Sequence, residues 1–131
     1  MIKHKSQGIV WFSYEPLDNL GFLNNWTTTR TTDFAKNAGG SKSESLALAN
    51  RVFAGGKKIY LPKQVHGTDI HELLGENDST VPADAVFVKN PGLSVGVLTA
   101  DCIPLILADP VQKTVCVVHA GRKGVFLNIV E

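Results

Sequence analysis

The sequence has few of the residues that would tie it to a disulfide framework, a membrane or a nucleic acid. Its two cysteines, Cys102 and Cys116, cannot form such a framework. No apolar run approaches the roughly 18 residues that span a bilayer, and the N-terminus lacks the apolar segment of a signal peptide. The formal net charge is only +1 and the basic residues are scattered, which argues against nucleic-acid binding. We therefore expect a cytoplasmic protein with neither a membrane nor a nucleic-acid partner.

The residues that are present suit a globular chain built mainly of strands. With 44% hydrophobic and 19% charged residues in 131 positions, one core is within reach, so we expect a single domain over 1–131. The clearest helix is 44–54, which Ser41 or Ser43 could cap and which Gly55 and Gly56 would end. Aromatic and β-branched residues predict strands at 8–14, 58–66, 83–88, 93–99, 103–108 and 114–120, and a Thr-rich extended segment at 26–32.

A last predicted helix begins after residue 121, at the end of the final strand. It ends within about two turns on an apolar run that no Gly, Asn or Pro closes. Its apolar face is expected to pack against further chain. From this pattern we expect a C-terminally truncated domain.

Three residues with metal-binding side chains fall at predicted strand ends. His66 and His119 are each followed within two residues by glycine, in 64-QVHG-67 and 118-VHAG-121, and Cys102 lies at the junction of two apolar runs in 98-LTADCIPLILAD-109. One thiolate and two imidazoles could hold zinc with a fourth position open, as in catalytic sites. The spacing alone is a weak signal, because no local C-x-x-C or H-E-x-x-H motif is present, and it also suits hydrogen-bonded histidines and a buried cysteine.

The same motifs resemble those of a known family. The strings 64-QVHG-67, 83-ADAV-86, 99-TADCIPLIL-107 and 118-VHAG-121 resemble the YfiH family, also called the polyphenol oxidase or laccase-domain family. The resemblance covers roughly residues 20 to 125. It implies an α+β fold, a mixed β-sheet sandwich with flanking helices, of which this chain would be the N-terminal half to two-thirds.

The resemblance also implies a zinc site and an activity. His66, Cys102 and His119 would be the metal ligands, with Cys102, His119 and Asp101 in catalysis. The family is associated with purine nucleoside phosphorolysis and adenosine deamination, so a purine nucleoside and phosphate are the implied partners. Asp101 would accept a hydrogen bond from a ligand histidine or act only as a turn carboxylate.

Copper oxidation is the other activity associated with this family. A blue-copper centre usually adds an axial Met to two His and one Cys, and the only Met here is Met1. Four histidines are also too few for a multicopper oxidase. We therefore expect copper only as a non-native occupant of the zinc ligands.

The substrate-binding residues are less well marked. Gln64 could contact substrate or hold a neighbouring loop, Arg30 could meet an anionic group, and Lys123 could meet phosphate near the start of the last helix. The family motif HAGWRG reads 119-HAGRKG-124 here, so Arg122 replaces Trp and Lys123 replaces Arg. Lysine keeps the charge but loses the planar fork of arginine.

Two other functions remain open from the sequence. Cys102 could be the nucleophile of a thiol hydrolase with His119 as its base. The chain could also be an inactive remnant that still binds metal. Cys116 is expected in the core and His71 at the surface, and the oligomeric state stays undetermined.

Overall fold

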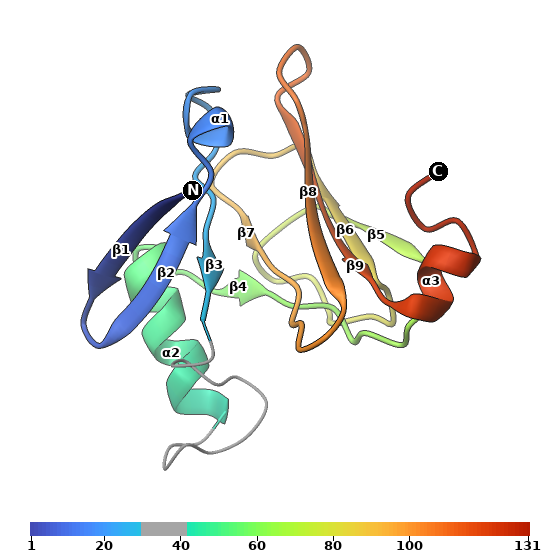
Figure 1. Cartoon of the computed structure of the whole chain (residues 1–131), viewed down its shortest axis with the longest axis horizontal. Coiled ribbons are helices and arrows are strands. Elements are labelled where there is room, and N and C mark those ends of the chain that lie inside the picture. Colours follow the sequence, from blue (N-terminus) through green and yellow to red (C-terminus); the bar gives the residue numbers. More distant parts are fainter. Residues whose placement is uncertain (30–41) are drawn as a thin grey trace. The chain divides into compact units, whose positions relative to one another are not determined.

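The computed structural model describes residues 1–29 and 42–131 and divides the chain into two compact units, Met1–Lys57 and Lys58–Glu131 (Figure 1). Over these residues the strands form three sheets, and the helices are few, so the chain has a mixed α/β structure. None of the helices in the described part is long and apolar enough to cross a membrane. The expectation of one domain over 1–131 stays a prediction.

The first unit contains a three-stranded antiparallel sheet and two helices. Its sheet has the order β1 (Ile2–Ser6), β2 (Ile9–Ser13) and β3 (Thr27–Thr28). The two-residue turn between β1 and β2 has positive φ at both Gln7 and Gly8, which is the backbone of a tight hairpin. The helices are α1 (Glu15–Asp18) and α2 (Lys42–Phe53).

An aromatic cluster joins α2 to this sheet. Phe53 meets Trp11 edge-on at 5.2 Å between ring centroids and stacks on Trp26 at 5.0 Å. On β1, His4 stacks on Trp11. The end of α2 is thereby fixed to β2 and to the segment that enters β3.

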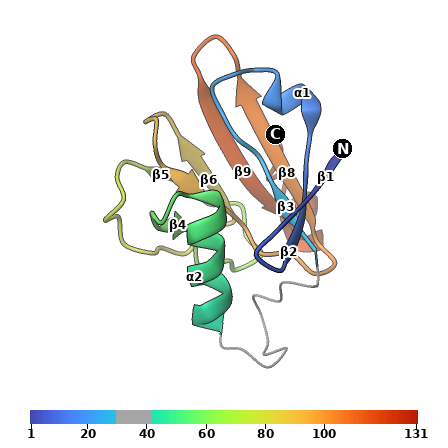
Figure 2. The same ribbon diagram turned by 90° about the vertical axis from the view of Figure 1, so that its left-hand side faces the viewer.

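The second unit contains the remaining two sheets. In the smaller one, β4 (Ile59–Tyr60) and β7 (Ser94–Val95) are parallel. The larger is a mixed sheet in the order β5 (Ile70–Leu73), β6 (Ala85–Val88), β9 (Thr114–Ala120) and β8 (Ile103–Asp109), in which only β5 and β6 are parallel. Figures 1 and 2 show β8 and β9 as the longest pair, and α3 (Arg122–Phe126) follows β9.

Strand β6 is buried on both faces of the larger sheet. On one face Val86 and Val88 pack with Tyr60 and Leu73, and Leu93 and Val95 cover them. On the other face Ala85 packs with Val118, Ala120 and Ile129. Successive side chains of a strand point to opposite faces, so two apolar clusters clamp the same strand. The residues just before β6 and near the end of β9 are therefore held on a rigid support.

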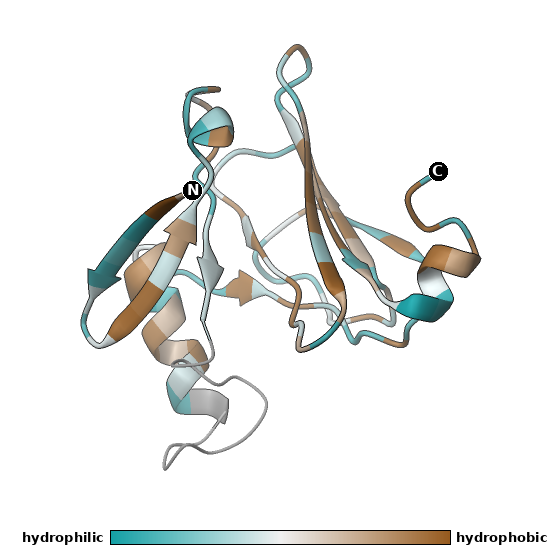
Figure 3. Cartoon of the chain, in the orientation of Figure 1, coloured by the Kyte–Doolittle hydropathy of each residue, from teal (hydrophilic) through white to brown (hydrophobic). Residues whose placement is uncertain are grey.

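Several predicted elements are confirmed, and others were missed. Strands at 8–14, 83–88, 103–108 and 114–120 and the helix at 44–54 correspond to β2, β6, β8, β9 and α2, whereas 58–66 is strand only at Ile59–Tyr60. The sequence did not reveal β1, α1 or β5. Figure 3 shows why β1 was missed, because it is mostly hydrophilic next to the hydrophobic β2. Ser41 and the side chain of Ser43 lie outside the described part, so the predicted cap is untested.

Candidate metal centre

Three side chains from separate segments of the second unit converge. His66 lies in the loop between β4 and β5, Cys102 immediately precedes β8, and His119 is the last residue but one of β9. One potential ligand atom from each lies within 4.8 Å of the other two. The rings of His66 and His119 meet edge to face, with 4.9 Å between their centroids. The structure therefore brings together the three residues that the sequence nominated as ligands.

The backbone at His66 is strained and is held by a carboxylate. His66 has a φ of 60°, in the left-handed region that non-glycine residues rarely adopt. The N–H groups of Val65, His66 and Gly67 all donate to the carboxylate of Asp84, at 3.2, 2.9 and 2.7 Å. Strained backbone of this kind persists only where surrounding contacts impose it. Here Asp84 supplies those contacts.

Asp84 also holds the ring of His119. Their Oδ1 and Nδ1 atoms are 2.8 Å apart, and the two residues are only 0% and 3% exposed. Because the carboxylate is an acceptor, Nδ1 carries the proton, which leaves the Nε2 lone pair free to bind a metal. Burial raises the pKa of Asp84, but hydrogen bonds from His119 and from Gly67, Val65 and His66 together hold it below its ordinary value. The group is therefore ionised at neutral pH.

Gly121 lies next to all three candidate ligands. A Cβ atom placed there would lie 3.0 Å from His66 Cδ2, 3.4 Å from Cys102 Sγ and 3.4 Å from His119 Cε1. The φ of Gly121 is −74°, which any residue can adopt, so the glycine is needed for space and not for its backbone conformation. All three candidate ligands thus surround a position where an added Cβ atom would crowd them.

The three residues fit a zinc ion. With metal–ligand lengths of about 2.0 to 2.3 Å, ligand atoms of a tetrahedral centre lie roughly 3.3 to 3.7 Å apart. The observed limit of 4.8 Å is wider, so the side chains would need to close by about an ångström. One thiolate and two imidazoles leave a fourth position, and His66 is exposed, which keeps the site open to solvent.

Of the two roles considered for Asp101, its position in the described structure favours the turn carboxylate over the acceptor for a ligand histidine. It is exposed, and its carboxylate makes no hydrogen bond with another described residue. The acceptor that holds a candidate ligand histidine is Asp84 instead, because Asp84 is buried beside β9 whereas Asp101 lies in an exposed bend. A catalytic role for Asp101 stays a prediction.

The predicted substrate-binding residues are placed as follows. Both polar groups of the Gln64 amide pair with the backbone of Leu98, with Nε2 donating to its carbonyl at 2.8 Å and Oε1 accepting from its N–H at 2.7 Å. This is the loop-holding alternative, and a contact with substrate stays a prediction. Lys123 is exposed on α3. Arg30 lies outside the described residues.

The two remaining candidates lie outside the group of three ligands. Cys116 packs against the cluster of Ala85, Val118, Ala120 and Ile129, as predicted for a core residue, and burial raises the pKa of its thiol. His71 is half-buried and not at the surface, because it stacks on Tyr60.

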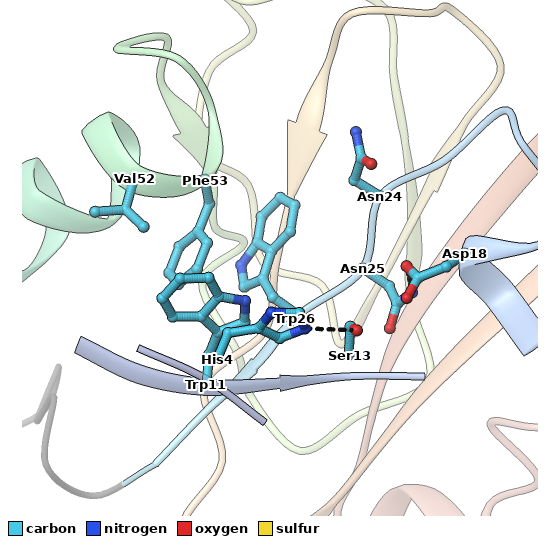
Figure 4. A pocket seen from close by; sticks show the side chains of 9 residues that line it. All are labelled: His4, Trp11, Ser13, Asp18, Asn24, Asn25, Trp26, Val52 and Phe53. Atoms are coloured by element: carbon cyan, nitrogen blue, oxygen red, sulfur yellow. Dashed lines mark hydrogen bonds between the residues drawn. The ribbon is translucent and has the colours of Figure 1, made fainter. Parts of the chain in front are cut away.

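The first unit has a cavity of about 360 Å³ beside its aromatic cluster (Figure 4). Four of the polar side chains that line it pair with one another. His4 Nε2 is 2.9 Å from Ser13 Oγ, and the Asn25 amide donates to Asp18 at 2.7 Å. Its lining holds none of the three candidate metal ligands and consists of His4, Trp11, Ser13, Asp18, Asn24, Asn25, Trp26, Val52 and Phe53.

Asp84 is the functional residue that the sequence reading missed. The string 83-ADAV-86 was noted as a motif, but no role was given to its aspartate. An aspartate directly before a fully apolar strand was the available signal, because such a side chain is buried only if donors surround it.

Comparisons with known proteins place these residues in context. Residues 36–131, more than half of the chain, match the family model described as multi-copper polyphenol oxidoreductase laccase. The chain is 33% identical over 123 residues to purine nucleoside phosphorylase SCO2081 of Streptomyces coelicolor, which covers 86% of this chain and 51% of the relative. It is 38% identical over 85 residues to purine nucleoside phosphorylase YfiH of Shigella flexneri, which covers 62% of this chain and 35% of the relative.

A solved structure has the same fold over nearly the whole chain. The Neisseria meningitidis protein NMB0706, of the family model DUF152, aligns with a TM-score of 0.69 at 16% identity and covers 98% of this chain and 53% of the other. The present chain thus spans about half of that protein. It spans about half of the Streptomyces coelicolor relative and about a third of the Shigella flexneri relative.

Proposed function

Because this chain belongs to the multi-copper polyphenol oxidoreductase laccase family, which is the YfiH or laccase-domain family, we propose that it acts on purine nucleosides with a bound zinc ion. The proposed reaction is phosphorolysis, with adenosine deamination as a further reaction. The relatives named purine nucleoside phosphorylases are longer proteins, so their activity supports this proposal without establishing it.

The observation that carries the proposal is the convergence of His66, Cys102 and His119. These side chains come from three segments, and two of the three segments adjoin the rigid sheet formed by β6, β9 and β8. When bound there, zinc would act as a Lewis acid or lower the pKa of a coordinated water. The chain has four histidines and a single Met, at its first position, and this composition favours zinc over an electron-transfer copper centre.

The chain's own residues prepare the site for that ion. Asp84 holds the Nδ1 proton of His119 and leaves Nε2 for the metal. Gly121 leaves room between the three ligands. His66 lies on the exposed side, where a nucleoside can approach from solvent. We place the substrate phosphate near Lys123, with Gln64 and Arg30 as further substrate contacts. We also propose that the protein works in the reducing cytoplasm.

The test is metal content followed by turnover. Elemental analysis of the purified chain should give zinc near one ion per chain, and His66→Ala and Cys102→Ala should lose it. Cys116→Ala is the matched control, because it removes the other cysteine and should keep the metal. Phosphate-dependent release of free base from inosine or adenosine should follow the zinc content.

Each other outcome overturns part of the proposal. Copper at full occupancy would contradict the choice of zinc. Zinc without turnover of any nucleoside would make the chain an inactive metal-binding remnant. Absence of metal from the parent chain, with its fold intact, would contradict the metal site altogether.

A thiol hydrolase is the second candidate, and one observation favours it. Asp84 holds the ring of His119, and a ring nitrogen of His119 lies within 4.8 Å of the Cys102 sulfur. A carboxylate, an imidazole and a thiol are the groups that Cys–His catalysis uses. In that case a chelator should leave the activity unchanged and alkylation of Cys102 should abolish it. Loss of activity on chelation would exclude this candidate.

A further inference from the structure

We propose that Asp84 is the positioning residue of this site, and that its one carboxylate places two ligands at once, His66 through its backbone and His119 through its ring. The proposal rests on the metal-binding part of the proposed function. It assigns to Asp84 a role distinct from that of a ligand, because its oxygens are already occupied by the protein.

The hydrogen bonds to Asp84 require a carboxylate. Oδ1 accepts from the N–H of His66 at 2.9 Å and from Nδ1 of His119 at 2.8 Å. Oδ2 accepts from the N–H groups of Val65 at 3.2 Å and Gly67 at 2.7 Å. Three of the four partners are backbone N–H groups, which can only donate and which reach both oxygens, so both oxygens must be acceptors. An asparagine would place its NH₂ group where one of the two oxygens now lies. That group is a donor and would face the N–H groups that now donate to the oxygen.

The carboxylate also explains the unusual backbone of His66. A left-handed turn lets three successive N–H groups point to one side, and such a concave row of amides binds an anion. The residue pays a strain of about 1 to 3 kcal/mol for this conformation. Asp84 is 0% exposed, so protein donors and not solvent surround this carboxylate. Without it the turn would relax and the His66 ring would leave the other two ligands.

Main-chain pairing fixes Asp84 against the second ligand. The N–H of His119 donates to the carbonyl oxygen of Asp84 at 2.7 Å, and the next residues continue as the β6–β9 ladder. The carboxylate is therefore in register with the imidazole before any metal binds. The carboxylate favours the tautomer with its proton on Nδ1, in which Nε2 is the nitrogen that can bind a metal, so no proton has to move within that ring.

Metal affinity of an Asp84→Asn variant is the first test. Competition of the chain against a chromophoric chelator should show zinc binding about 10- to 100-fold weaker than in the parent. The matched control is Asp69→Asn, which makes the same change of charge on an exposed side chain that hydrogen bonds to no other described residue. The control should bind zinc as the parent does.

The Co²⁺ form gives a readout that loss of stability alone would not change. A folded Asp84→Asn variant should bind Co²⁺ with altered absorption bands, because the His66 and His119 nitrogens would be displaced. A folded variant that binds both metals with parental affinity and spectrum would overturn the proposal.

A measurement on the unmodified chain covers the case in which Asp84→Asn does not fold. In the metal-free protein, ¹⁵N shifts of the imidazole should show His119 locked as the Nδ1–H tautomer, while the exposed His66 exchanges between tautomers. His119 found as the Nε2–H tautomer, or exchanging like His66, would overturn the proposal. This result does not depend on nucleoside turnover, so failure of the proposed enzyme and failure of the Asp84 role give different outcomes.

Discussion

Asp84 Oδ1 and His119 Nδ1 lie 2.8 Å apart with almost no exposure of either residue, and the same oxygen accepts the backbone N–H of His66. One buried anion thus joins two segments that are 53 positions apart in the chain, from His66 to His119. Folding of the second unit and formation of the candidate metal centre therefore depend on the same contact.

Acid should weaken the metal-free chain through Asp84. Hydrogen bonds outweigh burial and lower the pKa of this carboxyl from its ordinary value of 3.8. A lowered folded pKa means that the ionised group stabilises the fold above pH 3.8, and that this stabilisation is lost as the pH falls through the lower, folded value. Urea unfolding of the metal-free chain at several pH values should show the free energy of unfolding fall as the pH drops through the folded pKa of Asp84.

Asp84→Asn is the comparison for that measurement. It should lower the free energy of unfolding at pH 7 by about 1 to 3 kcal/mol, because buried donors lose their acceptor. The free energy of unfolding of this variant should also change less with pH in the acid range. An unchanged acid dependence in the variant would mean that another carboxyl is responsible.

Gly121→Ala should weaken metal binding more than it weakens the fold. The added methyl group would lie 3.0 Å from the His66 ring and in contact with Cys102 and His119, so one or more ligands must shift. Gly121 is the N-cap of α3 with an ordinary φ, so the stability should change by less than about 1 kcal/mol. We expect zinc affinity to fall about tenfold, measured by chelator competition beside thermal unfolding.

Gly96→Ala is the control, because it crowds a place in the second unit that holds no candidate metal ligand. A Cβ there would meet only the apolar side chains of Leu61 and Ile59, at 3.2 and 3.6 Å. Zinc affinity should stay at the parental value in this variant. Equal losses of affinity in both variants would show that general crowding, and not contact with the ligands, is the cause.

The sequence allowed the three candidate ligands to be predicted, because each stands at the end of a predicted strand, although His66 lies in the loop between β4 and β5. His119 and Cys102 adjoin β9 and β8, which the pattern of β-branched residues marks well. Their convergence was not derivable from spacing and came from the resemblance of motifs. It depends on the order of β6, β9 and β8 in the sheet, which local sequence does not encode.

Asp84 could not be distinguished from Asp101 by sequence. Both are aspartates directly before or near apolar strands, and the difference lies in burial, which arises when β6 becomes the clamped strand of the larger sheet. The short β1 and β5 were missed for a related reason. Their residues, IKHKS and IHEL, are stabilised as strands by pairing with β2 and β6 and not by their own propensity.

The two thiols should differ in reactivity. Burial raises the pKa of Cys116, so its thiol stays protonated and slow to react at pH 7 to 8. Cys102 borders the open site beside His66. Iodoacetamide followed by peptide mass spectrometry should label the metal-free chain mainly at Cys102, and zinc should protect that residue. Equal labelling of both cysteines, or no protection by zinc, would contradict the placement of Cys102 as a ligand.

Gln64→Ala should reveal whether Gln64 holds a loop or contacts substrate. It removes two hydrogen bonds to the backbone of Leu98, so the free energy of unfolding should fall by about 1 to 3 kcal/mol. Gln112→Ala, at an exposed turn, should leave it unchanged. If Gln64 serves the loop alone, the variant should lose stability in urea with or without a nucleoside present. A rise in the KM for nucleoside at unchanged stability would instead make Gln64 the substrate contact that we propose.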